Sequence, residues 1–322
     1  MPQPNRLTIN LDDVRCRYSG TSEVGLQRES KREQKARDIS LVVSDSHSWH
    51  PKGERHSMEH PFFSLSKKKK DLVPRHYVSK DGKSQLTVTP TVPGLPTIWD
   101  KDLLIFMATL IREAMNRGEM SLENRPIRIE TWDFLEATVK GDGAQQYKGL
   151  IATLDRLKGC MIKTSIETNG ISYTEAFSLL DKYNITGKTK TGKIAALEIK
   201  VCDWLYGAIF NDTQEMLSIN RDYFKLKGGI ERRLYELARK HCGTQPFWIV
   251  NMETLWKKSG SQSTLRDFRH KVFKGQIDLG TLPDYRVELW PDDDQVIFYS
   301  KHHKAAVKAL LDVTRKKKQH VD

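Results

Sequence analysis

The stretch from Ile230 to Tyr299 constrains the fold most, because its segments follow one another in a recognisable order. A helical run, Glu231 to His241, is followed by Gly243, a residue type that readily takes the left-handed conformation that terminates helices. A short β-type run, two helices separated by Ser259 to Gln262, and two further β-rich runs complete the stretch. Helix, strand, helix, turn, helix and hairpin is the order of a winged helix–turn–helix, in which the helix after the turn enters the DNA major groove.

The third helix of this stretch, Ser263 to Gln276, has an apolar side and a basic side. At about 100° per residue, four apolar residues share one side and predict packing against a core: Leu265, Phe268, Val272 and Phe273. Hydroxyl groups and free backbone N–H groups at the start of a helix suit a phosphate oxygen. The candidate DNA contacts are therefore the basic residues of the helix and the polar residues that open it: Arg266, Arg269, His270, Lys271, Lys274, Ser261, Ser263 and Thr264.

Charge supports this interpretation only together with the order of the elements. Between Glu231 and Ile277 there are ten Lys and Arg residues against four acids, and this surplus is half of the net charge of +12. From charge alone, a solvated basic face on an ordinary helix is the better explanation. The helices and strands around residues 263–276 reverse that preference.

Length and composition place the chain in a broad class. A chain of 322 residues has room for two domains with tails, and a pI near 9.4 indicates a polyanionic partner, nucleic acid rather than an anionic membrane surface. No run of 18 apolar residues and no signal-peptide segment occurs, so we expect a cytoplasmic protein without a membrane partner. The cysteines have no paired spacing, which argues against a zinc module and against disulfides: Cys16, Cys160, Cys202 and Cys242.

The N-terminal third is predicted to lack a core of its own. Residues 1–57 are rich in Ser, Arg, Glu and Lys without an apolar period, which predicts a disordered basic and polar tail. Residues 58–98 form an extended hairpin and connector, with Asp81-Gly82 at the hairpin turn. A lysine run beside aromatic residues, Lys67, Lys68, Lys69 and Lys70, gives candidate phosphate contacts. A solvated basic loop explains this run as well.

A second copy of the element order lies upstream. A helix from Trp99 to Arg117, which Asp100 is expected to cap, precedes a strand at residues 127–130 and a short helix from residue 131 to 139. The next helix, residues 144–158, directs three candidate DNA contacts outward: Gln145, Lys148 and Arg156. A hairpin at Asn169-Gly170, with its second strand from Ile171 to Leu180, and a strand over residues 193–201 follow.

These observations predict an α+β fold with two tandem winged helix–turn–helix domains. We expect domain 1 over residues 99–215 and domain 2 over residues 216–303, both for DNA binding. A helix and a basic tail over residues 304–322 follow. Six tryptophans fall within apolar patterns and are predicted to lie in the core: Trp99, Trp132, Trp204, Trp248, Trp256 and Trp290.

Patterns typical of catalysis are weak. Gly187-Lys-Thr189 lacks the earlier glycine of a phosphate loop, and Asp292 to Asp294 fit the tip of a turn better than a Mg²⁺ site. His47, His50, His302 and His303 do not have the spacing of a metal-dependent nicking enzyme. The chain is therefore predicted not to be an enzyme, and to need neither a metal nor a cofactor.

Four passages resemble the plasmid replication initiator proteins of the RepA type found in bacteria: Met58 to Lys70, Val88 to Phe106, Tyr147 to Gly159 and Ile230 to Gly243. The resemblance covers residues 58–299 and implies tandem winged-helix domains that bind repeated double-stranded sites in a plasmid origin. It also implies local duplex opening, loading of the host helicase, and dimers that form through domain 1, residues 99–215, and repress their own gene. The acidic turn at Asp292 to Asp294 departs from expectation, because it repels phosphate.

Two other functions stay open at this point. A transcriptional repressor without initiator activity has the same fold and the same basic helix. A primase or a nicking enzyme is the second alternative.

Overall fold

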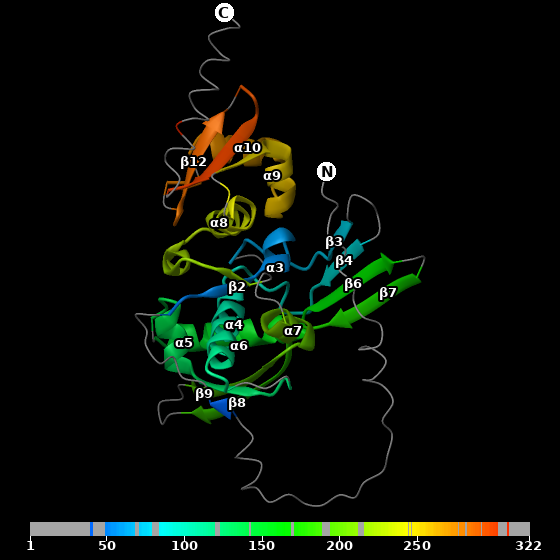
Figure 1. The fold of residues 1–322 in the computed structure, drawn as a ribbon, viewed down its shortest axis with the longest axis vertical. Coiled ribbons are helices and arrows are strands. Elements are labelled where there is room, and N and C mark those ends of the chain that lie inside the picture. The colour runs from blue at the N-terminus through cyan, green and yellow to red at the C-terminus, as the bar shows by residue number, and fades with distance from the viewer. Residues whose placement is uncertain are drawn as a thin grey trace, which may run out of the picture. The chain divides into compact units, whose positions relative to one another are not determined.

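The protein is described from a computed structural model (Figure 1). The structure describes residues 39–40, 49–67, 71–78, 84–119, 123–141, 143–168, 171–188, 194–211, 216–243, 245, 247–275, 277–280, 282–290, 292–301 and 308. All of these residues belong to one compact unit, residues 39–322. None of the helices within these ranges is long and apolar enough to cross a membrane.

The first half, the described residues from 99 to 211, begins with the helix that occupies most of its core. Helix α4 (Lys101–Asn116) is buried from Lys101 to Ile111 and at Ala114, because apolar residues fill most positions from Leu103 to Ile111. Gly118 ends it with φ +74°, a conformation that glycine adopts without strain. Strand β5 (Ile127–Glu130), helix α5 (Thr131–Ala137) and helix α6 (Ala144–Gly159) follow as predicted.

The strands after α6 differ from the prediction. Strand β6 (Met161–Thr168) pairs with β7 (Ile171–Phe177), but the expected single strand from Ile171 to Leu180 ends at Phe177. A separate strand that the sequence analysis missed, β8 (Leu180–Lys188), pairs with β9 (Ile194–Val201). The irregular pairing of β8, with register shifts near Gly187, explains why its sequence carries no clear alternating pattern. Helix α7 (Asp203–Asn211) closes the first half.

Two four-stranded sheets divide these strands between them. One has the order β1-β5-β9-β8, where β1 (Ile39–Ser40) runs parallel to β5. The other has the order β3-β4-β6-β7, in which β3 (Arg75–Val78) and β4 (Ser84–Thr89) form the expected hairpin. In Figure 1 the β6–β7 hairpin continues the β3–β4 hairpin as one sheet.

The second half, the described residues from 216 to 301, contains the stretch that the sequence analysis singled out. Strand β10 (Met216–Ser218) and a short 3₁₀ helix, η1 (Arg221–Lys225), lead into α8 (Gly229–Cys242). Strand β11 (Phe247–Asn251), α9 (Met252–Ser259), α10 (Leu265–Phe273), β12 (Tyr285–Trp290) and β13 (Gln295–Ser300) follow. Gly243 terminates α8 with φ +50°.

The two halves share one sheet arrangement. In the second half the strand between the first two helices, β11, pairs with the last strand, β13, to give the order β11-β13-β12. In the first half β5 pairs with β9 in the same way, so the equivalent hairpin is β8–β9. The sequence analysis assigned this place to the hairpin at Asn169-Gly170, which is wrong: β6 and β7 are an insertion that pairs with β4 in a different sheet.

The predicted tail also ends too late. Trp49 is buried, with its ring centroid 5.7 Å from that of Phe224 and 5.9 Å from that of Phe106. Strand β2 (Lys52–Glu54) pairs with β10, and helix α3 (Arg55–Glu59) packs on α8. Residues 49–57 are therefore part of the fold. Short segments of this kind, anchored by one large aromatic residue, have no periodic pattern to reveal them.

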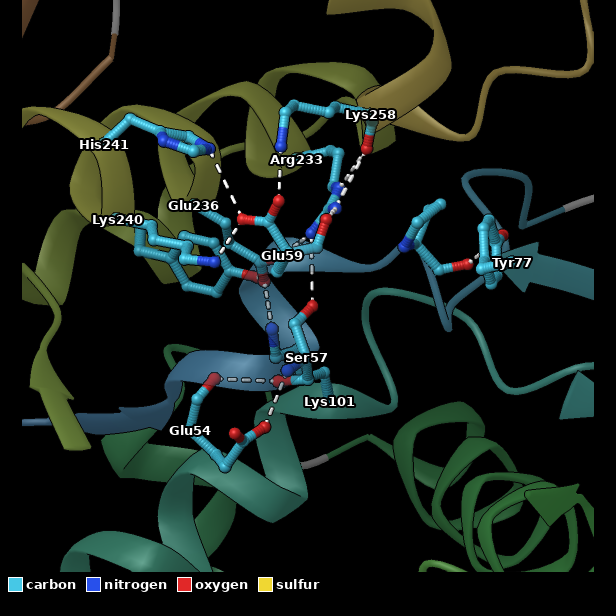
Figure 2. A network of polar contacts seen from close by, with 12 residues as sticks. Glu54, Ser57, Glu59, Tyr77, Lys101, Arg233, Glu236, Lys240, His241 and Lys258 are labelled. Carbon is cyan, nitrogen blue, oxygen red and sulfur yellow. Dashed lines mark hydrogen bonds and ion pairs between the residues drawn. The ribbon is translucent and has the colours of Figure 1, made fainter. Parts of the chain in front are cut away.

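Buried charges join the two halves. Arg232 Nη1 of α8 lies 2.6 Å from Asp102 Oδ1 of α4, and Lys101 Nζ lies 2.9 Å from Glu236 Oε1. Arg233 Nη1 lies 3.1 Å from Glu236 Oε2 (Figure 2). All five side chains are nearly inaccessible to solvent, so each charge depends on its partner.

Glu59 of α3 forms a second cluster next to these pairs. Its carboxylate is paired with Lys240 of α8 and Lys258 of α9, and it lies 3.5 Å from His241 Nε2 (Figure 2). Partial burial alone raises the pKa of Glu59, but the hydrogen bonds from Lys240 and Lys258 outweigh it and lower the pKa to about 2. Burial and the neighbouring Lys258 ammonium lower the pKa of His241 to about 4.

Candidate nucleic-acid interface

Helix α10 is shorter than predicted and starts differently. It spans Leu265–Phe273, and Thr264 caps it, because Thr264 Oγ1 accepts a hydrogen bond of 3.1 Å from the backbone N–H of Asp267. Ser263, the predicted first residue of the helix, lies before it, and its hydroxyl pairs with that of Ser261 at 2.9 Å. Residue 276, the predicted end, lies outside the described residues.

The apolar stripe of α10 is confirmed. Phe268 and Val272 are fully buried, and Leu265 and Phe273 pack partly against the same core. This packing leaves Arg266, His270 and Lys274 exposed. They are spaced four residues apart and therefore share one face of the helix. Lys271 is half-buried.

An ion pair fixes α10 to the turn of its hairpin. Arg269 Nε and Nη2 lie 2.7 and 2.8 Å from the two carboxylate oxygens of Asp294. Asp294 has φ +51°, and its carbonyl accepts a hydrogen bond of 2.9 Å from Met252 N. One carboxylate of the acidic turn is thus neutralised within the protein. The Arg269 guanidinium, expected to face DNA, is held beside α10 and is partly exposed.

The turn before α10 is held by side chains as well as by its backbone. Asn251 Oδ1 caps α9 by accepting a 2.8 Å hydrogen bond from Thr254 N. Gly260 leaves α9 with φ +71°, and Trp256 Nε1 donates to Ser263 O at 2.9 Å across the turn. Both ends of the turn are therefore fixed relative to α10.

The corresponding helix of the first half carries fewer charges outward. Leu150, Leu154 and Leu157, which recur at helical spacing along α6, are buried. Gln145 and Lys148 are exposed near its start. The outward face of α6 is therefore more polar than basic.

Arg156, the third residue predicted to read DNA from α6, is engaged elsewhere. Its Nε and Nη2 atoms each lie 2.7 Å from an oxygen of Asp100, and Thr153 Oγ1 donates to the same carboxylate at 2.5 Å. These hydrogen bonds raise the pKa of Arg156. Asp100 makes no side-chain capping bond at the start of α4, contrary to expectation, because its carboxylate holds α6 and accepts from Thr97 N.

Several cations that contributed to the predicted basic surplus do not face solvent freely. Arg232 and Arg233 are buried, and Lys240 and Lys258 are paired with Glu59. The acidic partners of Arg232, Lys240 and Lys258 lie far away in the sequence, so local periodicity gave no signal of these pairs, whereas Arg233 pairs with Glu236 within α8. The exposed face of α10 is therefore one of the places in the second half where basic side chains face solvent.

The lysine run is described only at its first residue. Lys67 is exposed, and its Nζ lies 4.3 Å from the ring centroid of Trp99. Lys68, Lys69 and Lys70 lie outside the described residues.

Comparison with known proteins identifies the family. The family model described as "Replication initiator protein A" matches residues 52–287, which are most of the chain. The chain belongs to this replication initiator family. A "Putative replication protein" of Wigglesworthia glossinidia brevipalpis is 35% identical over 250 residues, which cover 76% of this chain and 86% of that protein.

Solved structures support the same fold for this initiator. Crystal structures of domains 2 and 3 of RctB superpose with TM-scores of 0.57 and 0.53 and cover 76% and 77% of this chain. Each covers 98% of the RctB chain. Sequence identities of 12% and 10% restrict this likeness to the mixed α+β fold.

Proposed function

We propose that this replication initiator is a DNA-binding protein with two tandem winged-helix domains, residues 99–215 and 216–303, that binds repeated double-stranded sites in a plasmid origin. Binding opens the duplex nearby and helps load the host helicase. The protein acts in the cytoplasm, and the first domain forms the homodimer. It needs no cofactor and catalyses no reaction.

The observation that carries the proposal is the exposed face of α10. Arg266, His270 and Lys274 lie on one side of a helix whose other side is locked by Phe268 and Val272. The Arg269–Asp294 pair prevents the helix from rolling about its axis. A rigid helix with one cationic face matches the geometry of major-groove recognition.

Position along α10 assigns roles to the first and last residues of this face. Residues near the start of a recognition helix approach base edges, so Arg266 reads a base, most favourably guanine. Lys274, at the other end, contacts the phosphate backbone. Gln145 and Lys148 occupy the corresponding first turn of α6 and contact a second groove about one helical turn away.

Replacement of Arg266 tests the assignment. We expect Arg266→Ala to weaken binding to an origin duplex by about 1–3 kcal/mol and to relax the preference at one base pair. A scrambled duplex should lose little, because phosphate contacts remain. Lys225→Ala serves as the matched control, since Lys225 is exposed and paired with Asp222 at 2.7 Å. Equal losses on both duplexes for Arg266→Ala contradict the base-reading role.

Complementation separates the initiator from a repressor of the same fold. A plasmid that lacks its own initiator gene should replicate when this protein is supplied in trans, and the Arg266→Ala variant should support fewer copies. Repression of a reporter without plasmid replication favours the transcriptional repressor instead.

A further inference from the structure

Three cations surround Trp99 at the start of the first half. Lys67 Nζ lies 4.3 Å from the ring centroid, and Arg232 Cζ lies 5.8 Å from it. Lys140 Nζ donates to the backbone carbonyl of Trp99 at 3.5 Å. These cations come from the segment after α3, from α8, and from the turn between α5 and α6.

Asp102 is the carboxylate that balances part of this positive charge, and both of its oxygens already face a cation. It is buried, and its two oxygens pair with Arg232 at 2.6 Å and with Lys140 at 2.9 Å. Lys67 makes no ion pair with any residue in the described parts of the chain. Burial, then repulsion by Arg232 and Lys140, lowers the pKa of Lys67 despite the attraction of Asp102. The free protein thus carries a surplus of positive charge here.

We propose that Lys67 and Lys140 together bind one phosphate of the DNA backbone, with Asp102 and Arg232 as positioning residues. This site rests on the proposed function and adds a contact at the place where the two halves meet. Lys67 is exposed, and Lys140 keeps 28% of its side chain accessible. An ammonium has three donors, and within the described residues Lys140 uses one in a hydrogen bond to Trp99 O while it also forms an ion pair with Asp102.

The backbone before Lys140 fixes its position. Val139 N donates to Glu136 O at 3.0 Å, and Lys140 N donates to Leu135 O at 2.7 Å. These are the two hydrogen bonds of a Schellman motif. Val139 has φ +55°, a strained conformation for a β-branched residue. Strain retained at one turn is typical of a position that serves binding. Lys140 also immediately precedes the segment that opens α6.

Polynucleotide is the phosphate source that fits these observations. Lys67 begins a run of four lysines, and a run of this kind follows successive phosphates of a backbone rather than one small anion. Arg232 and Lys140 repel the exposed Lys67 ammonium, and a duplex phosphate offsets that repulsion.

Salt dependence of binding tests the site. For Lys67→Met, the slope of log K against log salt should fall by about 0.9, equally on origin and scrambled duplexes. Lys225→Met, the matched control, should leave the slope unchanged. Lys67→Glu should bind DNA still more weakly, yet raise the melting temperature of the DNA-free protein, because a carboxylate there meets Lys140 and Arg232. A residue that merely stabilises the fold does not show these opposite shifts.

The outcomes separate this site from the wider function. Wild-type protein that binds neither duplex overturns the proposed function. Wild-type protein that binds the origin, with a slope unchanged by Lys67→Met or changed equally by Lys225→Met, overturns this site alone. Stabilisation of wild-type protein by ATP that is lost in Lys67→Met, with an unchanged slope on DNA, assigns the site to a free nucleotide and also overturns the proposal.

Discussion

The first and second halves use the same helices and sheet order, but they fix their third helix differently. In the first half, Arg156 of α6 is held by Asp100, next to the buried helix α4. In the second half, Arg269 of α10 is held by Asp294, in the turn between β12 and β13. Each pair has two parallel hydrogen bonds, so each defines the orientation of its helix.

The difference indicates a division of labour. The Arg156–Asp100 pair ties α6 to the helix that also contacts α8, so the first half positions its groove-facing residues relative to the second. The Arg269–Asp294 pair lies at the surface and leaves the basic face of α10 open. The simplest explanation is that the first half positions the protein on DNA and that the second half reads the bases.

The largest expected effect concerns the contact between the halves. Arg232→Ala leaves Asp102 buried with only Lys140 as a partner, so we expect the free energy of unfolding to fall by about 3–5 kcal/mol. Urea unfolding followed by tryptophan fluorescence measures this change. The double variant Asp102→Leu with Arg232→Met removes both charges and should recover most of the loss. Independent unfolding of two halves in wild-type protein contradicts their description as one unit.

The first loss of stability in acid should come from a group in the second half. Residues 99–215 contain no histidine, whereas His241 stacks on Trp248 with ring centroids 4.4 Å apart. The pKa of His241 is lowered from 6.5 to about 4, so the unfolded chain takes up this proton first as pH falls. The contribution of neutral His241 to the free energy of unfolding is fully present above pH 6.5. It is lost between pH 6.5 and 4, by no more than about 3 kcal/mol.

A stacking variant isolates this effect. His241→Phe keeps an aromatic ring on Trp248 but cannot be protonated, so unfolding measured from pH 7 to 4.5 should lose much of its pH dependence. Glu59 adds a separate loss only below pH 4.5, as pH falls toward its pKa of about 2. An unchanged pH profile in His241→Phe places the acid sensitivity elsewhere.

The two arginine pairs should differ in their contribution to stability. Arg156→Ala leaves the buried carboxylate of Asp100 without its cation, and we expect a loss of about 1–3 kcal/mol by thermal or urea unfolding. Arg269→Ala should leave the melting temperature near that of wild type, because both partners of this ion pair are partly exposed to solvent. Its effect should appear as weaker binding to the origin duplex. If both variants have the same melting temperature, the two ion pairs do not differ in their contribution to stability.

The smallest expected effect concerns the turns that end helices. Gly118 after α4 and Val139 after α5 form the same double hydrogen bond, with φ of +74° and +55°. Val139→Gly should raise stability by about 1 kcal/mol, and Gly118→Ala should lower it by a similar amount. A Cβ at Gly118 meets no atom within 4 Å, so backbone strain is the relevant cause. If both variants change the free energy of unfolding in the same direction relative to wild type, this explanation is wrong.

The sequence predicted the elements with a strong period and missed those that depend on distant partners. The stripes of α6 and α10 were visible because Leu150, Leu154, Phe268 and Val272 recur at helical spacing. Strand β8 was missed because its pairing with β9 is irregular. The equivalent hairpin was misassigned because Asn169-Gly170 is a strong local turn signal, whereas strand order is decided by long-range pairing.

Candidate site residues show the same limit. Spacing placed Arg266, His270 and Lys274 on one face, and the structure has them there. Spacing did not reveal the Asp100 partner of Arg156, which lies 56 residues away. Trp132, predicted to be core from its apolar neighbours, is 54% exposed. A short helix such as α5 exposes one side whatever its average hydrophobicity.

The opposed charges of α4 and α8 also restrict how such proteins can exchange parts. Lys101 and Asp102 each face a complementary charge contributed by α8, and all of these groups are sealed from water. Consider a chimera that joins the C-terminal half of one relative to the N-terminal half of another. It will assemble only if the charges of its α4 are complementary to those of its α8. Recombination between plasmids should therefore preserve the two halves as a matched set.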